Sequence, residues 1–139
     1  MRARHKILLV WLMPLLLLTG CHRSQSASAP PKPISVVTMV HVSCVHDSST
    51  ISRQYTQERN MQFVLNYLRL LPFQGSADTD PERVLGDEYR ITLQLSDGRI
   101  RVYRQRAGRY LSIDCHPWYQ TDPEKASSLL PFLQETPSD

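Results

Sequence analysis

The 139-residue chain lacks the short motifs that identify most structural metal sites and hydrolases. No two of its cysteines stand at the close spacing typical of a structural zinc site. None of its serines lies in a nucleophile elbow, and the chain contains no internal repeat. It also has no apolar run of the roughly 20 residues that span a membrane comfortably. No enzymatic or metal-dependent function therefore follows from a motif.

An excess of charge is also missing once the N-terminus is set aside. Arg2, Arg4 and Lys6 are three of the 16 basic residues, and they lie ahead of all 13 acidic residues. The formal net charge of +3 therefore belongs to the first six residues, and the rest of the chain is balanced. A nucleic-acid binder carries a basic surface that such a balance does not supply, so we expect no nucleic-acid partner.

The N-terminal segment has the arrangement of a signal peptide. The three basic residues precede an apolar stretch at residues 7–18, which has the expected length for the core of such a signal. The run Leu18-Thr19-Gly20-Cys21 that follows resembles the lipobox of bacterial lipoprotein precursors. The resemblance implies that residues 1–20 are removed and that Cys21 carries a diacylglycerol and a further acyl chain, with no other cofactor. It also implies attachment to a bacterial membrane outside the cytoplasm.

Two other interpretations of this segment stay open, an ordinary cleaved secretory signal and a retained membrane anchor. The small residues Thr19 and Gly20 directly before Cys21 favour the lipoprotein. The next residue is His22, whereas an aspartate at this place tends to keep lipoproteins of diderm bacteria at the inner membrane. The resemblance therefore implies the outer membrane in a diderm host and the cell membrane otherwise.

The rest of the chain divides into a tether, one domain and a tail. Residues 21–33 are rich in serine, alanine and proline and have almost nothing to bury, which is typical of a tether. Residues 34–133 are long enough for one small domain with a thin core. Residues 134–139 are expected to form a polar tail.

The hydrophobic pattern predicts an α+β domain. Residues 34–46 alternate as a strand with one apolar face. Residues 57–71 follow helical spacing, and their apolar arc exceeds half the circumference, so the flanks of this helix should be covered as well. The pattern of residues 122–130 predicts a short helix, and Pro131 limits its length. We expect a small antiparallel sheet of about four strands with the long and the short helix packed on one face.

Three of these strands are predicted between residues 89 and 114. Asp97-Gly98 favours a two-residue type I′ turn between the first two strands. The pairs that follow from this turn are Leu95 with Ile100 and Leu93 with Val102. Ala107-Gly108 favours a second tight turn, or a longer one, because a tight turn would place Arg106 opposite Arg109.

This register places Arg99, Arg101 and Tyr103 together on the outer face of the sheet. Guanidinium groups beside an aromatic ring can hold phosphate or carboxylate. The alternative is an ordinary solvated face that the acidic loop at residues 76–88 neutralises. We expect a non-catalytic interaction module that binds an envelope protein or an anionic envelope polymer, with the oligomeric state left open.

Cys44 and Cys115 are the two cysteines that the anchor does not use. Both share a face with apolar neighbours, and outside the cytoplasm such a pair usually forms a disulfide. A bridge would close a loop of about 70 residues and would contribute on the order of 4 kcal/mol. The alternatives are two free thiols, or a zinc or copper site of a metal-binding lipoprotein that combines both cysteines with His46 and His116.

A small envelope hydrolase is the remaining alternative. Carboxylates of the 76–88 loop and Asp114 could pair for glycan hydrolysis, or a cysteine could combine with a histidine. Neither arrangement has a flanking signature, and an inward-facing cysteine is usually inert. We therefore predict no catalytic residues.

Overall fold

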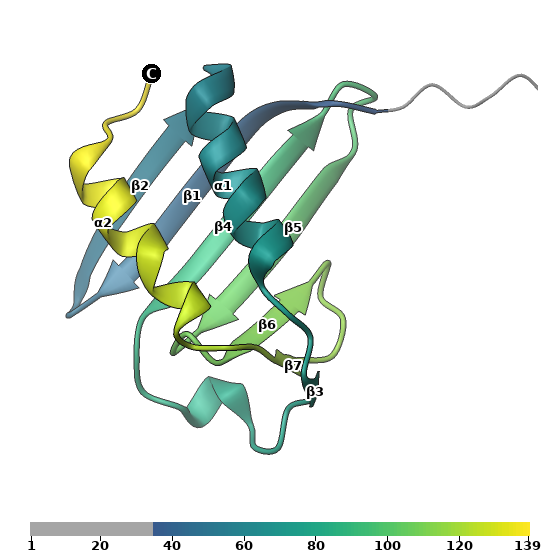
Figure 1. The fold of residues 1–139 in the computed structure, drawn as a ribbon, viewed down its shortest axis with the longest axis vertical. Coiled ribbons are helices and arrows are strands. Elements are labelled where there is room, and N and C mark those ends of the chain that lie inside the picture. Colours follow the sequence, from purple (N-terminus) through teal and green to yellow (C-terminus); the bar gives the residue numbers. More distant parts are fainter. Residues whose placement is uncertain (1–34) are drawn as a thin grey trace, which may run out of the picture. The chain divides into compact units, whose positions relative to one another are not determined.

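The computed structural model describes residues 35–139, which form one antiparallel sheet with helices packed against it (Figure 1). In chain order the elements are β1 (Val37–His46), β2 (Ser49–Tyr55), α1 (Glu58–Leu70), β3 (Gly75–Ser76), the 3₁₀ turn η1 (Pro81–Arg83), β4 (Glu88–Leu95), β5 (Ile100–Arg106), β6 (Tyr110–Ile113), β7 (Tyr119–Gln120), η2 (Lys125–Ser128) and α2 (Leu129–Glu135). The predicted signal peptide at residues 1–20, Cys21 and the tether at 21–33 lie outside the described residues.

The prediction of about four strands is wrong, because the sheet has seven strands in the order β2-β1-β4-β5-β6-β7-β3. The prediction omits β2 because most of its residues are polar and it lies at the edge of the sheet. Asp47 and Ser48 both adopt positive φ angles, 44° and 64°, and they turn the chain sharply from β1 into β2. The other unpredicted strands, β3 and β7, have two residues each and pair with one another.

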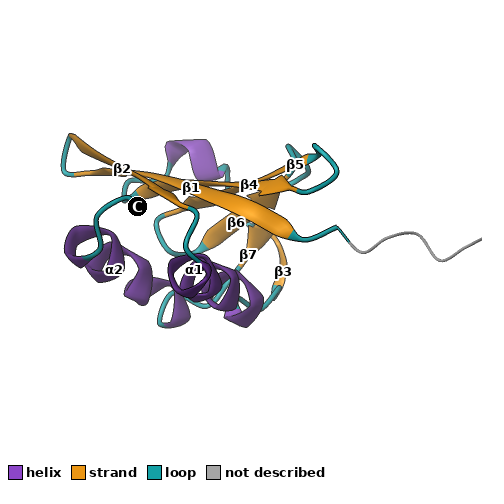
Figure 2. Cartoon of the chain, turned by 90° about the horizontal axis from the view of Figure 1, so that it is seen from above, coloured by secondary structure: helices purple, strands orange, loops and turns teal. Residues whose placement is uncertain are grey.

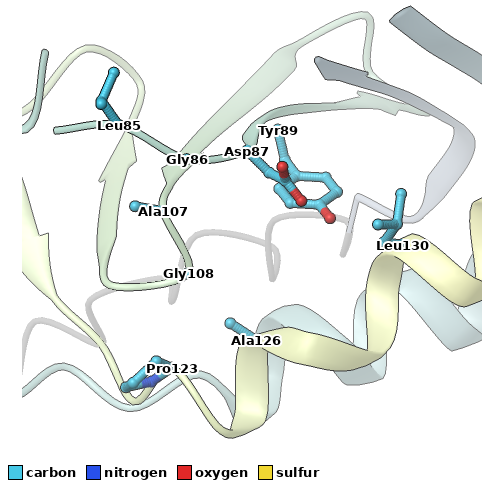
Figure 3. Close-up of a pocket in the computed structure, with 9 residues that line it drawn as sticks. All are labelled: Leu85, Gly86, Asp87, Tyr89, Ala107, Gly108, Pro123, Ala126 and Leu130. Atoms are coloured by element: carbon cyan, nitrogen blue, oxygen red, sulfur yellow. The ribbon is translucent and has the colours of Figure 1, made fainter. Parts of the chain in front are cut away.

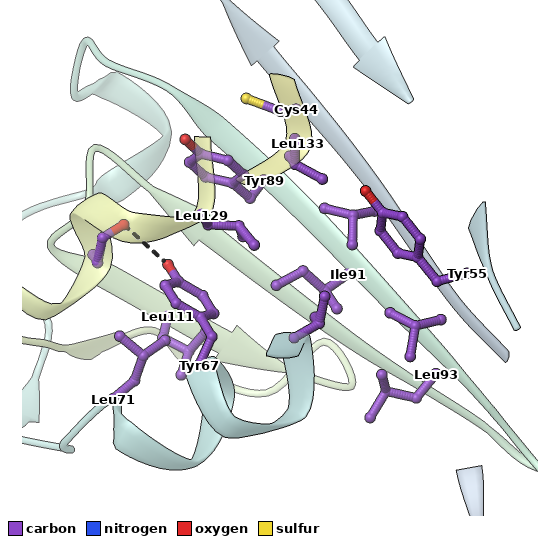
Figure 4. Close-up of a cluster of buried hydrophobic side chains, with 14 residues drawn as sticks. Cys44, Tyr55, Tyr67, Leu71, Tyr89, Ile91, Leu93, Leu111, Leu129 and Leu133 are labelled. Atoms are coloured by element: carbon purple, nitrogen blue, oxygen red, sulfur yellow. Dashed lines mark hydrogen bonds between the residues drawn. The ribbon is translucent and has the colours of Figure 1, made fainter. Parts of the chain in front are cut away.

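The two helices lie on one face of the sheet, as the sequence predicts, and η1 lies on the other face (Figure 2). Between the helices and the sheet, alternate residues of β1 and β4 are buried against both helices (Figure 4). Fully buried examples are Val40 and Val42 from the sheet, Val64 from α1, and Leu129 and Leu133 from α2. Burial of such side chains contributes roughly 1.5–3 kcal/mol each, so this layer is the main source of stability.

One polar side chain of β5 is part of this core. Gln105 is buried, and its carbonyl oxygen accepts a hydrogen bond from the hydroxyl of Tyr67 on α1. The same hydroxyl lies 3.3 Å from the carbonyl oxygen of Ala126, and this contact ties α1 to η2. Within residues 35–139 the Nε2 atom of Gln105 has no hydrogen-bond partner. An unpaired buried group of this kind costs about 1–3 kcal/mol, which the surrounding apolar burial offsets.

Helix α1 is held at its start by the last residue of the chain. The helix spans Glu58–Leu70, and its N-cap residue Gln57 makes no side-chain capping bond. Instead, the carboxylate of Asp139 accepts hydrogen bonds from the backbone N–H groups of Thr56 (2.7 Å) and Gln57 and from Nδ2 of Asn60 (2.9 Å). The predicted polar tail at residues 134–139 is therefore bound to the domain through Asp139.

Helix α2 continues through Pro131, although this proline is predicted to limit the helix. The proline is the third residue of α2, and a proline in the first turn lacks only an N–H group that would have no partner within the helix. The additional turn carries Leu133 into the core and extends the domain past the predicted boundary at residue 133.

The hairpin between β4 and β5 closes through a three-residue loop rather than the predicted two-residue turn. The N–H of Leu95 donates to the carbonyl oxygen of Arg99, and the N–H of Gly98 donates to that of Leu95, both at 2.9 Å. Of the loop residues only Gly98 has a positive φ, at 82°, whereas a type I′ turn needs two. The observed pairs are Gln94 with Ile100, Leu93 with Arg101 and Ile91 with Tyr103. This shift of one residue exchanges the two faces of β5.

Candidate functional site

The predicted anion-binding face at Arg99, Arg101 and Tyr103 is not formed. The Nε atoms of Arg99 and Arg101 lie 2.7 Å from carboxylate oxygens of Asp97 and Asp114, respectively, so both guanidinium groups are paired. Tyr103 faces the helices and is partly buried against the core. The physical reason is the three-residue hairpin loop, which reverses the faces of β5.

The other arginines of β5 point to the outer face, where they are also paired. Arg104 lies 3.0 Å from Glu82 and 3.1 Å from Glu88, and Arg106 lies 2.6 Å from Glu88. The guanidinium carbon of Arg104 also lies 5.1 Å from the ring centre of Trp118. The acidic segment around η1 therefore neutralises this face, which leaves little unpaired positive charge on β5 for a polyanion.

Cys44 and Cys115 are free thiols, so the predicted disulfide is not present in the structure. Cys44 is buried on β1, and the register leads from it through Tyr89 on β4 and Gln105 on β5 to Leu111 on β6. Three strand spacings amount to roughly 14 Å, whereas bridged cysteines have Cα atoms within about 7 Å. Cys115 lies past the end of β6 and is exposed.

The same separation divides the four residues of the alternative metal site. Cys44 and His46 lie at one end of β1, and Cys115 and His116 lie in the turn after β6. Among residues 35–139 no cluster of three or more cysteine, histidine or acidic side chains is arranged to hold a metal ion.

His46 has acidic partners in place of a thiol. Its Nδ1 atom lies 2.7 Å from Oδ1 of Asp87, and its Nε2 atom lies 3.2 Å from Oδ2 of Asp47. The hydrogen bond with Asp87 raises the pKa of His46 above its usual value. Burial raises the pKa of the Cys44 thiol, so this cysteine is not activated as a nucleophile.

A pocket of about 370 Å³ opens beside Asp87, at the end of β4 nearest η2 and α2 (Figure 3). Its lining residues are Leu85, Gly86, Asp87, Tyr89, Ala107, Gly108, Pro123, Ala126 and Leu130. The carboxylate of Asp87 and the hydroxyl of Tyr89 lie side by side at one wall, facing the apolar side chains of Ala126 and Leu130 (Figure 3). This combination of one charged group with apolar walls is typical of a small ligand site.

Small residues create this pocket. Gly86 has a φ of 141°, and a Cβ atom on it would lie 2.9 Å from Ala107, so the two segments can approach only because residue 86 is glycine. The N–H of Ala107 donates to the carbonyl oxygen of Asp87 at 2.8 Å and fixes the spacing of the two segments.

A second hollow of about 430 Å³ lies between α1 and the β5–β6 hairpin. Nine apolar residues and one arginine line it: Leu65, Leu68, Arg69, Leu71, Pro72, Phe73, Leu93, Tyr103, Leu111 and Ile113. We call it the α1 groove. Helix α2 packs on the opposite side of α1, over β2, and leaves this flank open (Figure 1). The wide apolar arc of α1 indicates such a surface in the sequence, and the arc also predicts that both flanks of the helix are covered, which the open groove contradicts for this flank.

Comparisons with protein-family models, with curated proteins and with solved structures gave no significant match. No helix within residues 35–139 is long and apolar enough to cross a membrane.

Proposed function

We propose that this protein is a lipid-anchored component of the bacterial cell envelope that acts as a non-catalytic interaction module. It binds an apolar segment of a partner protein in the α1 groove. The observation that carries the proposal is the groove itself, an apolar surface beside α1 that no element within residues 35–139 covers.

The proposed location rests on the N-terminal sequence. The apolar stretch at residues 7–18 and the lipobox-like run that ends at Cys21 are typical of lipoprotein precursors. Two or three acyl chains hold a protein stably at a membrane, whereas a single chain holds it only marginally. The proline-containing segment at residues 21–33 then separates the domain from the lipid surface.

The side chains at the rim of the groove define the chemistry of the partner. Phe73 lines the groove and is 55% exposed, so a partner segment in the groove would cover it together with the other apolar lining residues. Arg69 lies in the lining, and none of the ion pairs among residues 35–139 involves it. A segment with apolar side chains and an adjacent carboxylate would satisfy both features.

Photocrosslinking in the native membrane tests this proposal. We would place p-benzoylphenylalanine at Phe73, and as the matched control at Ile100, which is 60% exposed on the outer face of the sheet. We expect one discrete protein adduct from position 73, none from position 100, and loss of the adduct when Arg69→Glu is added. Adducts that are the same from both positions, or that persist with Arg69→Glu, would contradict the proposal.

A further inference from the structure

We propose that the pocket beside Asp87 binds a primary alkylammonium group, such as the side chain of a lysine. This pocket is separate from the α1 groove, and the inference does not depend on the proposed function. It rests on the charge, the hydrogen-bonding groups and the walls of the pocket.

The pocket presents one negative charge and no positive one. Asp87 is the only charged residue in its lining. Oδ1 of Asp87 is bonded to His46, and within residues 35–139 the other carboxylate oxygen, Oδ2, has no hydrogen-bond partner. His46 stands between Asp47 and Asp87, so the three groups together carry a net charge of −1 when His46 is protonated. A cationic ligand is therefore favoured over a neutral or anionic one.

The second polar group of the pocket also acts as an acceptor. The hydroxyl of Tyr89 lies at the wall of the pocket beside the carboxylate of Asp87 (Figure 3). The lone pairs of the hydroxyl oxygen remain for a ligand. A carboxylate oxygen and a phenolic oxygen side by side suit a ligand with several donors, and an ammonium group has three donors and no acceptor.

The walls of the pocket suit an apolar stem on this ammonium group. Ala107, Ala126, Pro123 and Leu130 line the pocket and offer no charged or hydroxyl group. A chain of methylene groups packs against such walls while its charged end reaches the acceptors, as lysine side chains do on protein surfaces. The volume of about 370 Å³ accommodates a slender side chain.

Binding can be measured with the full chain, ¹⁵N-labelled in a nonionic detergent, by titration followed with amide resonances. The probes are Nα-acetyl-lysine-N-methylamide, cadaverine as a free amine, and Nα-acetyl-norleucine-N-methylamide, which has an apolar stem without the ammonium group. We expect the lysine derivative to shift the amide resonances of Gly86, Asp87 and Ala107, and the norleucine derivative to leave them unchanged. Tighter binding of cadaverine than of the lysine derivative would support a free amine as the source of the ammonium group.

Two variants separate this proposal from a general effect on the fold. Asp87→Asn should weaken binding of the lysine derivative at least about tenfold, because it removes the charge of the acceptor and keeps its shape. Tyr89→Phe should weaken binding a few-fold, and Glu135→Gln, which removes an exposed carboxylate on α2, should leave it unchanged. Equal binding of the norleucine derivative, or unchanged affinity in both Asp87→Asn and Tyr89→Phe, would overturn the proposal, and neither result bears on the α1 groove.

Discussion

At the scale of single residues, Gly86 and Asp87 determine the shape and charge of the pocket together. Gly86 allows the segment before β4 to approach Ala107, and Asp87 then presents its carboxylate between His46 and the cavity. Neither residue stands in a recognisable motif. Their roles follow from neighbours about 20 and 40 positions away in the sequence, Ala107 and His46, which a local pattern does not contain.

Gly86→Ala should destabilise the protein by about 2–3 kcal/mol, since it combines backbone strain with overpacking against Ala107. Gly75→Ala is the matched control, because Gly75 has nearly the same φ, 138°, and a Cβ atom there would meet nothing within 4 Å. Chemical denaturation of both variants measures the difference. If the two variants lose the same free energy of unfolding, the contact with Ala107 does not constrain residue 86.

The contact between His46 and Asp87 predicts a pH dependence of stability. The pKa of His46 is raised in the folded state, mainly by its hydrogen bond with Asp87. Its stabilising contribution is therefore complete below the unfolded-state pKa of about 6.5 and is lost as the pH rises through the raised folded-state pKa. His46→Gln should make the thermal unfolding midpoint depend less on pH across this range. A His46→Gln variant whose unfolding midpoint depends on pH as the wild type's does would contradict the role of this contact.

At the scale of elements, the β4–β5 hairpin shows what a local pattern can and cannot predict. The sequence correctly indicates two paired strands and a turn at Asp97-Gly98. The loop contains one more residue, and the side chain of Asp97 accepts a hydrogen bond from the backbone N–H of Arg99 within it. Apolar alternation favours Val102 on the inner face, whereas tertiary contacts place Tyr103 and Gln105 there. The predicted placement of Arg99, Arg101 and Tyr103 on the outer face is wrong because of this shift in register.

Helix α1 shows the opposite case. Its spacing predicts residues 57–71, and the helix spans Glu58–Leu70. Its apolar arc exceeds half the circumference of the helix, which also indicates a contact surface in addition to the face against the sheet. The sequence cannot reveal that α2 covers only one flank, because that depends on where β2 and the C-terminal residues are placed.

The contact between α1 and the C-terminal residues predicts a second pH effect, at acidic pH. Hydrogen bonds, first from Asn60 and then from the backbone of Gln57 and Thr56, lower the pKa of Asp139 to about 2. Its contribution is present above the unfolded-state pKa of about 3.8 and is lost as the pH falls through about 2. Asp139→Asn should lower the unfolding midpoint at pH 7 and reduce the loss of stability between pH 4 and pH 2.

Glu135→Gln is the control for this prediction, because it removes an exposed carboxylate from the same region without a partner at α1. Asp97, whose pKa is also lowered to about 2 by Ser35 and Arg99, accounts for part of the remaining acid transition. An Asp139→Asn variant that unfolds like the wild type at both pH values would show that the side-chain carboxylate of Asp139 does not hold α1.

At the scale of the whole molecule, the sequence predicts the α+β class of the domain better than it predicts the number of strands in the sheet. The inward faces of β1 and β4 and the position of both helices on one side follow from periodicity. Periodicity does not predict the edge strand β2, the two-residue strands or the bound C-terminus. Long-range pairing stabilises these parts, and no local sequence pattern marks them. Both hollows combine residues from segments that are distant in the sequence, so neither is visible before the fold is known.

The most direct test of the account as a whole is the mass of the mature protein extracted from bacterial membranes, with thiol alkylation before and after denaturation and without reduction. The account predicts a chain that begins at Cys21 and carries acyl groups, in which Cys115 is alkylated in the folded protein and Cys44 only after denaturation. Glu135→Gln or another surface variant should not alter this pattern. An unacylated chain, or two thiols that resist alkylation until a reductant is added, would contradict the proposed anchor or the separation of the cysteines in the sheet.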